Sequence, residues 1–298
     1  MSVDTVLSVE GLAVRYGPRT VLEGVSFDVP RGAVFALIGR NGTGKSSLVR
    51  CALGQQKPTR GATRLFGEDA WASRARAMAR IGVVPEEPDA PPDMTPLELL
   101  AFCAPLYDTW DDAAARARLE RSAVPLQVRF GSLSKGQKGA VMLALALAAA
   151  PELLILDDPT LGLDAVARRA LYDELIGDLA DRGTTALVTT HDLDGIEPIA
   201  DRVAVLHGSR LVANEALDAL KARFRRIRCG ASGPPSWEPF EPIITVVKDW
   251  GREAVVTNFT EERRAAFLAR AGDSEVEVAA LSLEEIFLAL AGTPEARS

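Results

Sequence analysis

Hydrophobic and polar residues alternate with a period of two at the start of the chain. Residues 6–9, 11–16 and 25–30 carry apolar side chains at alternate positions and are separated by glycine and proline. This pattern predicts an antiparallel β segment. The apolar run over residues 33–38 then predicts a buried strand, and residues 47–53 predict the helix that follows it.

Strands and helices alternate through much of the remaining chain. Further strands are predicted at residues 81–84, 153–156, 185–189 and in a hairpin over 202–212. Helical periodicity is found over residues 71–80 and between 88 and 130, where strands are missing. Strands separated by helices of ten or more residues are typical of a mainly parallel sheet with helices packed on it. We therefore expect an α/β fold with a helical subdomain inserted at about residues 87–150.

The C-terminal part of the chain reads as a separate small α/β module. The loop-rich segment 230–235 is followed by predicted strands at residues 243–247, 254–257 and 276–280 and by a helix at 261–270. We expect one domain over residues 1–220 and a second over 221–298. Arg223, Arg225, Arg226 and Arg228 at the junction are explained most simply as a solvated strand face.

One helical face near the C-terminus carries Leu283, Ile286, Phe287 and Leu290. This face predicts a helix that packs within the C-terminal module. The alternative is a helix that forms a dedicated site for a partner protein.

Composition narrows the classes of function. The chain has 298 residues and a net charge of −7, which argues against a general nucleic-acid binder. Its three cysteines are widely spaced and lack C-x-x-C or histidine pairing, so we expect a reducing cytosol and neither a disulfide framework nor a zinc site. We find no secretory signal and no apolar run long enough to span a membrane, so we expect any membrane role to come through a partner.

The segment from Gly39 to Ser46 fits the phosphate-binding pattern G-x-x-x-x-G-K-[ST], between a predicted strand and a predicted helix. Glycines let the loop wrap around phosphate oxygens, and the helix start points its N–H groups at the anion. Lys45 is predicted to hold the β and γ phosphates of a nucleoside triphosphate, and Ser46 a Mg²⁺ ion. The other residues predicted to contact the nucleotide here are Gly39, Asn41, Gly42, Thr43, Gly44 and Ser47.

The apolar strand over residues 153–156 ends in two carboxylates, Asp157 and Asp158. An acid at the edge of a parallel sheet commonly organises Mg²⁺ beside a phosphate loop. We predict that Asp157 ligates or orients the metal. A solvated acidic turn is the alternative for this pattern taken alone.

A second candidate anion site is Leu133-Ser134-Lys135-Gly136-Gln137, which opens an alanine-rich helical run over residues 139–150. Taken by itself, the segment is explained more simply as a serine-capped helix. Together with the phosphate loop it resembles the ATP-binding subunit of ATP-binding cassette (ABC) transporters, whose signature segment usually reads L-S-G-G-Q. Lys135 stands here in place of the first glycine. The resemblance covers residues 4 to about 218.

The resemblance implies roles for further residues. Tyr16 matches the aromatic residue that stacks on adenine, with an ordinary strand tyrosine as the alternative. His191 matches the switch histidine that contacts the γ-phosphate. Asp164, in the segment 159–164, matches the loop that joins two subunits. Because the family sandwiches ATP between one subunit's phosphate loop and the other's signature, the residues expected to serve the partner's nucleotide are Ser134, Gly136 and Gln137.

Two positions depart from the family pattern. Asp158 stands where a glutamate usually polarises the attacking water, and it is one methylene shorter, so hydrolysis is expected to be slow. Glu86 stands where many members place a glutamine that contacts Mg²⁺ and this water, and its carboxylate would serve both roles. The resemblance therefore assigns Asp158, His191 and Glu86 to catalysis, and Ser46, Glu86 and Asp157 to the metal.

We expect an ATPase subunit that dimerises on ATP, with itself or a sister ATPase, and drives a multi-span membrane permease from the cytoplasmic face of the membrane. The segments 105–111, 132–138 and 281–290 look like those of the ABC-2 branch of bacterial exporters. In this family the inserted helical arm is where the permease docks. The residues that would line the docking groove are Phe102, Leu106, Tyr107 and Trp110. The alternative is that these residues form the core of the arm itself. Alternatives are a slow ATP-dependent regulatory switch, which Asp158 would favour, and a soluble ABC protein acting on nucleic acid.

Overall fold

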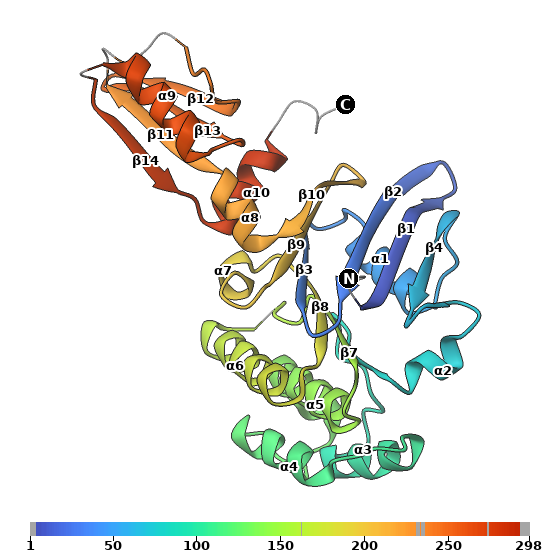
Figure 1. Cartoon of the computed structure of the whole chain (residues 1–298). Coiled ribbons are helices and arrows are strands. Elements are labelled where there is room, and N and C mark those ends of the chain that lie inside the picture. Colours follow the sequence, from blue (N-terminus) through green and yellow to red (C-terminus); the bar gives the residue numbers. More distant parts are fainter. Residues whose placement is uncertain (1–3, 162, 231–232, 234–235, 273, 293–298) are drawn as a thin grey trace. The chain divides into compact units, whose positions relative to one another are not determined.

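A computed structural model describes residues 4–161, 163–230, 233, 236–272 and 274–292 (Figure 1). The chain divides into two compact units, Met1–Leu211 and Val212–Ser298. The division falls inside strand β10 (Arg210–Ala216), whereas the sequence placed the boundary after residue 220. Among the described residues, no helix has the length and apolar character needed to cross a membrane.

A six-stranded sheet, counted over the described residues, has the order β10-β9-β3-β8-β7-β6, and its strands other than β10 lie wholly in the first unit. Strand β3 pairs in parallel with β8 and β9, and β7 pairs in parallel with β6 and β8. The bounds of these strands are β3 Val34–Gly39, β6 Ile81–Val84, β7 Leu153–Asp157, β8 Thr185–Thr190 and β9 Arg202–His207. The carboxyl ends of β3, β7 and β8 meet at one edge, where open parallel sheets bind ligands.

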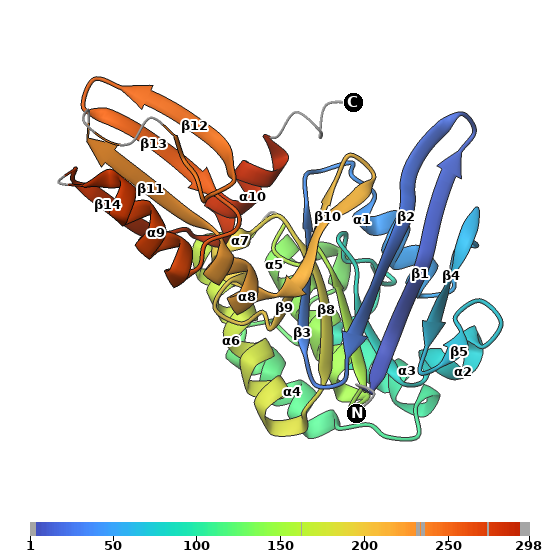
Figure 2. The same ribbon diagram turned by 45° about the horizontal axis from the view of Figure 1, so that its top comes forward.

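The first unit also contains an antiparallel sheet. Its order is β2-β1-β4-β5, and Figure 2 shows β1 and β2 as long neighbouring strands. The bounds are β1 Thr5–Tyr16, β2 Arg19–Pro30, β4 Arg60–Leu65 and β5 Glu68–Asp69. The two strands predicted over residues 6–16 form one strand, because Gly11 adopts a φ of 57° and lets β1 continue across a register shift between Val9 and Leu12.

Helix α1 (Lys45–Ala52) contacts strands of both sheets and joins their cores. Leu48 is fully buried on this helix, and Phe27 of β2 stacks on Phe35 of β3 with ring centroids 4.9 Å apart. Aromatic stacking and buried aliphatic side chains contribute strongly to core stability. The phosphate loop before α1 is thus anchored on both sides by packed elements.

The helical subdomain contains α3 (Pro96–Cys103), α4 (Asp112–Arg121) and α5 (Lys135–Ala148), with two short 3₁₀ turns at Ala104–Leu106 and Phe130–Ser132. Thr95 caps α3 in a reciprocal capping box with Glu98, as a Thr-x-x-Glu pattern predicts. The subdomain has its own core, listed by its largest buried members as Leu99, Leu100, Leu119, Phe130, Leu133 and Val141. Helix α5 also packs on β6, which ties the subdomain to the parallel sheet.

The helix predicted over residues 71–80 is shorter in the structure, where α2 covers Arg74–Met78. The carboxylate of Asp69 accepts a hydrogen bond from the Ala72 amide, and the Ser73 hydroxyl donates to the Asp69 carbonyl. These local bonds stabilise a turn that competes with the helix. The remaining helices of the first unit are α6 (Ala165–Arg182) and α7 (Leu193–Ile196).

The second unit has a four-stranded antiparallel sheet, over its described residues, in the order β12-β13-β11-β14. The bounds are β11 Arg225–Gly230, β12 Pro242–Lys248, β13 Gly251–Val256 and β14 Val276–Ala280, with helices α8 Leu217–Arg223, α9 Glu261–Ala271 and α10 Leu283–Ala291. Phe267 of α9 is buried in the core of this unit. Leu283 and Ile286 are fully buried on α10, so α10 is a packing helix.

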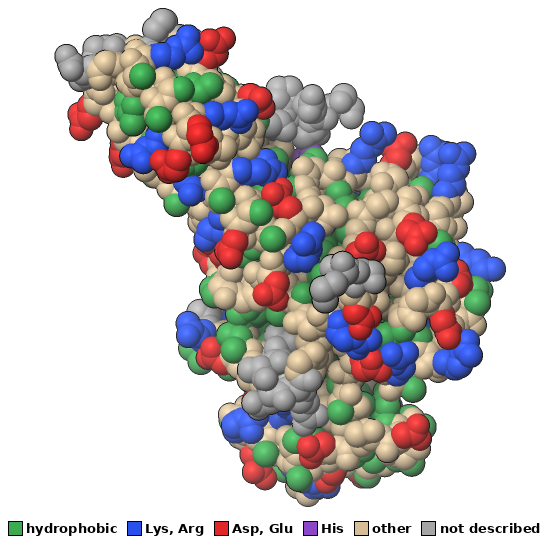
Figure 3. Space-filling model, in the orientation of Figure 1, with side chains coloured by type: hydrophobic (Ala, Val, Ile, Leu, Met, Phe, Trp, Pro, Cys, Tyr) green, Lys and Arg blue, Asp and Glu red, His purple; other side chains and the backbone are tan. Residues whose placement is uncertain are grey.

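Two arginines of β11, Arg226 and Arg228, lie on one face of the strand and are paired with acids. Arg228 lies 2.8 Å from Glu253, and Arg226 lies 2.8 Å from Glu285. On the face of the molecule shown in Figure 3, basic and acidic side chains are interspersed over each unit. That face therefore carries no large patch of charges of a single sign.

Candidate functional site

The phosphate loop begins at the last residue of β3 and extends into the first turn of α1. Gly42 and Gly44 have φ values of 80° and 108°, a region that residues with a side chain rarely adopt. A Cβ atom at Gly44 would also lie 2.7 Å from Cδ2 of Leu22, and one at Gly39 would lie 2.8 Å from the Leu206 carbonyl oxygen. The predicted glycines are therefore required by backbone conformation and by close packing.

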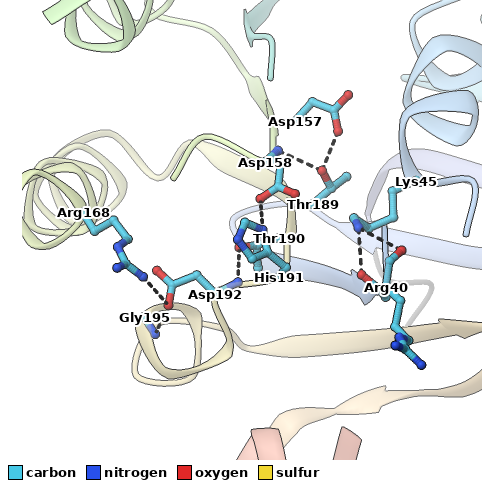
Figure 4. A network of polar contacts seen from close by, with 11 residues as sticks. Arg40, Lys45, Asp157, Asp158, Arg168, Thr189, Thr190, His191, Asp192 and Gly195 are labelled. Carbon is cyan, nitrogen blue, oxygen red and sulfur yellow. Dashed lines mark hydrogen bonds and ion pairs between the residues drawn. The ribbon is translucent and has the colours of Figure 1, made fainter. Parts of the chain in front are cut away.

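Lys45 lies inside this loop and is only 6% exposed. Its Nζ donates to the carbonyl oxygen of Gly39 at 2.7 Å and to that of Arg40 at 3.4 Å, and Figure 4 shows Lys45 beside Arg40. Burial lowers the pKa of Lys45, while the charges of Asp158, Asp157 and Glu86 act in the opposite direction. The ammonium is thus held at the centre of a cleft whose acids lie close enough to influence it.

A cleft of about 470 Å³ brings most of the predicted nucleotide residues together. This volume lies within the usual range of small-molecule sites. Its lining residues are Tyr16, Arg19, Val21, Asn41, Gly42, Gly44, Lys45, Ser46, Ser47, Glu86, Asp157 and Asp158. Sequence reasoning missed Arg19 and Val21. The antiparallel pairing of Tyr16 with Arg19 brings them to the cleft, and the short turn between two predicted strands was the signal available for it.

Tyr16 lines this cleft, and its hydroxyl is held by hydrogen bonds to other side chains. The hydroxyl donates to Gln56 Oε1 at 2.7 Å and lies 3.3 Å from Ser47 Oγ. The bond with Ser47 is the main cause that lowers the pKa of Tyr16. Because the ring is about half exposed while its hydroxyl is held, its face is accessible to a planar ligand.

The two carboxylates stand at the carboxyl end of β7, beside β8. The Thr189 hydroxyl donates to Asp157 Oδ1 at 2.6 Å, and the Asp158 amide donates to Thr189 Oγ1 at 3.0 Å. Asp158 is 5% exposed and has a φ of 49°, which is uncommon for a residue with a side chain. His191 Nδ1 lies 2.7 Å from Asp158 Oδ1 (Figure 4). Sequence reasoning placed these residues near one nucleotide, and the structure shows that they contact each other.

The donors in this cleft fit a Mg²⁺ ion bound together with phosphate. The predicted metal residues Ser46, Glu86 and Asp157 all line the cleft and present oxygen atoms. In the described part of the chain, His, Cys, Asp and Glu do not gather in groups of three that could hold a metal by themselves. Mg²⁺ usually binds one or two carboxylates plus substrate phosphates rather than a cage of protein ligands.

The signature segment forms the start of α5. Ser134 and Gln137 make a capping box, in which the Gln137 amide donates to Ser134 Oγ at 3.2 Å and the Ser134 amide donates to Gln137 Oε1 at 3.1 Å. The serine-capped helix is therefore present. Ser134, Gly136, Gln137 and Asp164 line a second hollow, between α4, α5 and α6, that shares no lining residue with the nucleotide cleft.

Asp164 begins the helix that follows it, since its Oδ1 accepts from the Ala167 amide at 2.8 Å. Gly162, in the same predicted loop, lies outside the described residues. The structure therefore separates the predicted residues into two groups, one around Lys45 and one around Ser134.

A glycine loop that joins a parallel strand to a helix, with a buried lysine and with acids at the end of another strand of the same sheet, defines a P-loop protein that binds nucleoside triphosphates. Residues 22–161 match the family described as ABC transporter. The chain is 37% identical over 217 residues to "Nod factor export ATP-binding protein I" of Ralstonia nicotianae, covering 70% of this chain and 66% of that protein. A protein of the same name from Rhizobium is 32% identical over 302 aligned positions, covering 96% of this chain and 97% of that protein.

A solved structure described as "Structure of ATP binding subunit of ABC transporter" superposes with a TM-score of 0.65 at 33% identity. The match covers 73% of this chain and 92% of the other. The chain belongs to the ATP-binding subunits of ABC transporters, and it is an ATPase. The predicted fold class is confirmed.

Proposed function

We propose that this protein hydrolyses ATP in the cleft around Lys45, pairs with a second ATP-binding subunit, and drives a separate membrane permease that exports its substrate. The observation that carries the proposal is that Lys45 and Asp158 line one cleft that the phosphate loop borders, and that His191 contacts Asp158 there. Export is supported by the printed names of the relatives, which are export proteins.

In the proposed reaction, the loop amides and Lys45 hold the phosphates, and Ser46, Glu86 and Asp157 would hold Mg²⁺. When bound, the metal would neutralise charge on the phosphate oxygens. Asp158 would orient the attacking water and accept its proton. Its buried carboxylate has a defined position because His191 contacts Oδ1, while the Thr189 hydroxyl accepts a hydrogen bond from the Asp158 backbone amide. General bases work best when the acceptor is held in place before the reaction.

The proposed dimer is supported by the separation of the two groups of site residues. Each chain offers one phosphate loop and one signature, which lie in different hollows. A two-fold pairing of identical chains would bring the signature of each copy to the cleft of the other. Two equivalent composite sites would result, and Asp164 would lie between them.

The proposed permease contact is on the helical subdomain. Phe102 and Leu106 are strongly exposed. Trp110 packs against the core of the subdomain, and the Tyr107 ring stacks on the Trp110 ring with centroids 5.8 Å apart. The four predicted groove residues therefore divide into two with a core role and two that are accessible. The protein would act peripherally, on the cytoplasmic side of the membrane.

The experiment that tests the proposal measures steady-state ATP hydrolysis and ATP affinity for the purified protein beside Lys45→Ala. Turnover that depends on Lys45 is the expected result. Light scattering with and without ATP would show whether pairs form, and an active strict monomer would overturn the dimer. If ATP binds tightly but the complex with its permease shows no turnover, the protein is a switch and not a motor.

A further inference from the structure

Lys135 is the residue at which this chain departs from the usual signature, and it makes a contact of its own. Its Nζ lies 3.0 Å from Oε1 of Glu87. Glu87 follows Glu86, which lines the nucleotide cleft. The ion pair therefore links the first residue of α5 to the segment that leaves β6 toward the cleft, across 48 positions of sequence.

The electrostatics around Lys135 favour an anion. A helix start carries a partial positive charge, so acids are favourable there and a lysine is not. The first turn of α5 contains no acidic residue, and it holds Lys138 in addition to Lys135. In this structure the anion that contacts Lys135 is the Glu87 carboxylate, and the Glu87 side chain is mostly exposed.

The Lys135–Glu87 ion pair is weak enough for a more strongly charged anion to displace Glu87 from Lys135. An ion pair exposed to water contributes little, because solvent screens it and two long side chains must be ordered. A lysine bound to a phosphate in a closed, water-poor site makes a stronger charge-assisted hydrogen bond. Lys135 would therefore leave Glu87 when a phosphate with more negative charge approaches the signature.

We propose that Lys135 is a phosphate-binding residue that exchanges Glu87 for the γ-phosphate of the nucleotide on the partner subunit when ATP closes the dimer. This inference rests on the proposed function, because it uses the proposed pairing of signature and phosphate loop. In the open state, Glu87 competes with the nucleotide for Lys135 and thus opposes closure. The pair then acts as a brake that ATP releases and ADP does not.

The exchange predicts opposite effects for the two ends of the pair. Lys135→Met removes the ligand for the γ-phosphate and should weaken ATP-driven dimerisation. Glu87→Gln frees the lysine and should strengthen it. If the ion pair serves only to hold α5 against the segment after β6, both substitutions remove the same contact and must shift dimerisation in the same direction.

The test uses full-length protein carrying Asp158→Asn, so that bound ATP persists, and measures the dimer dissociation constant by light scattering with ATP and with ADP. Affinity of the monomer for a fluorescent ATP analogue is recorded in the same samples. We expect Lys135→Met to weaken the ATP dimer about tenfold and Glu87→Gln to tighten it severalfold, with monomer affinity unchanged and Lys135→Arg close to the parent.

Matched controls are Lys138→Met, in the same helical turn, and Asp89→Asn, two residues from Glu87. Neither should change the dimer dissociation constant. Shifts of the same sign for Lys135→Met and Glu87→Gln, or an unchanged dimer for Lys135→Met, would overturn the exchange while leaving the proposed dimer intact. A parent protein that binds ATP and stays monomeric would overturn the dimer itself and the exchange with it.

Discussion

The imidazole Nδ1 of His191 and the carboxylate Oδ1 of Asp158 lie 2.7 Å apart, although the residues come from the ends of different strands. The pair forms because β7 and β8 are parallel neighbours, with Asp157 opposite Thr189 in register. His191 is well exposed, whereas Asp158 is buried. A buried carboxylate thus has a partner that faces the solvent and is placed to respond to a ligand.

Asp158→Asn should lower ATP turnover by on the order of 10²-fold or more, because the amide cannot accept the proton of the attacking water. ATP affinity should change little, since Lys45 and the loop amides remain. Steady-state hydrolysis and ATP titration on the same preparation measure both quantities. Asp249→Asn, at an exposed position of the second unit, is the control and should behave like the parent. Parental turnover by Asp158→Asn would assign the base to another residue.

Asp158→Glu should raise turnover above that of the parent protein. The added methylene carries the carboxylate farther from β7 into the cleft, and misplacement of a catalytic group by about 1 Å can cost about 100-fold in rate. The measurement is kcat at saturating ATP, with the purified subunit and again with its permease. The same substitution combined with His191→Ala separates reach from the histidine contact. An unchanged or lower kcat for Asp158→Glu would show that the shorter side chain does not limit the reaction.

The place of the phosphate loop between a strand and a helix could be predicted because its information is local. Gly39, Gly44 and Lys45 act through backbone conformation and helix position within eight residues of sequence, and such a pattern survives without knowledge of the rest of the fold. The helical face of Leu283 and Ile286 was predictable for the same reason. Periodicity within one helix determines which side chains are buried.

Contacts between distant segments were not accessible in this way. The Asp158–His191 and Lys135–Glu87 contacts depend on which strands are neighbours and on where α5 begins relative to β6. The residue type alone gives a charge but no partner. Arg19 was missed because its place in the cleft follows from the register of β1 and β2, which a turn signal suggests without fixing.

Glu152 should make the free energy of unfolding depend on pH. The hydrogen bond from Arg80, assisted by Arg31, lowers the pKa of Glu152 from 4.5 to about 2. A folded-state pKa below the unfolded one adds stability above pH 4.5 that is lost as the pH falls toward 2. Because the Glu152 side chain is 39% exposed, screening reduces the contribution to about 1 kcal/mol. The Glu152→Gln variant should be less stable than the parent at pH 7 by this amount.

Urea unfolding of both proteins at several pH values between 7 and 2 measures the difference. The gap between the parent and Glu152→Gln should shrink steadily below pH 5. Glu68→Gln, which removes a more exposed pair with Arg76, is the control and should show a smaller gap at pH 7. A gap for Glu152→Gln that stays constant down to pH 2 would mean that packing, and not ionisation, accounts for the loss.

Phe102→Glu together with Leu106→Glu should abolish capture of the permease while sparing ATP binding. Both side chains are exposed at the end of α3 and in the turn after it, so the charges should be tolerated by the fold and rejected by an apolar partner surface. Pulldown of the co-expressed permease, with ATP affinity measured beside it, gives the result. The matched control is Leu288→Glu in the second unit, since Leu288 is 60% exposed and Leu106 is 66% exposed. Normal capture by the double variant would place the docking surface outside this part of the helical subdomain. An equal loss of capture with Leu288→Glu would show that the docking surface is not confined to the helical subdomain.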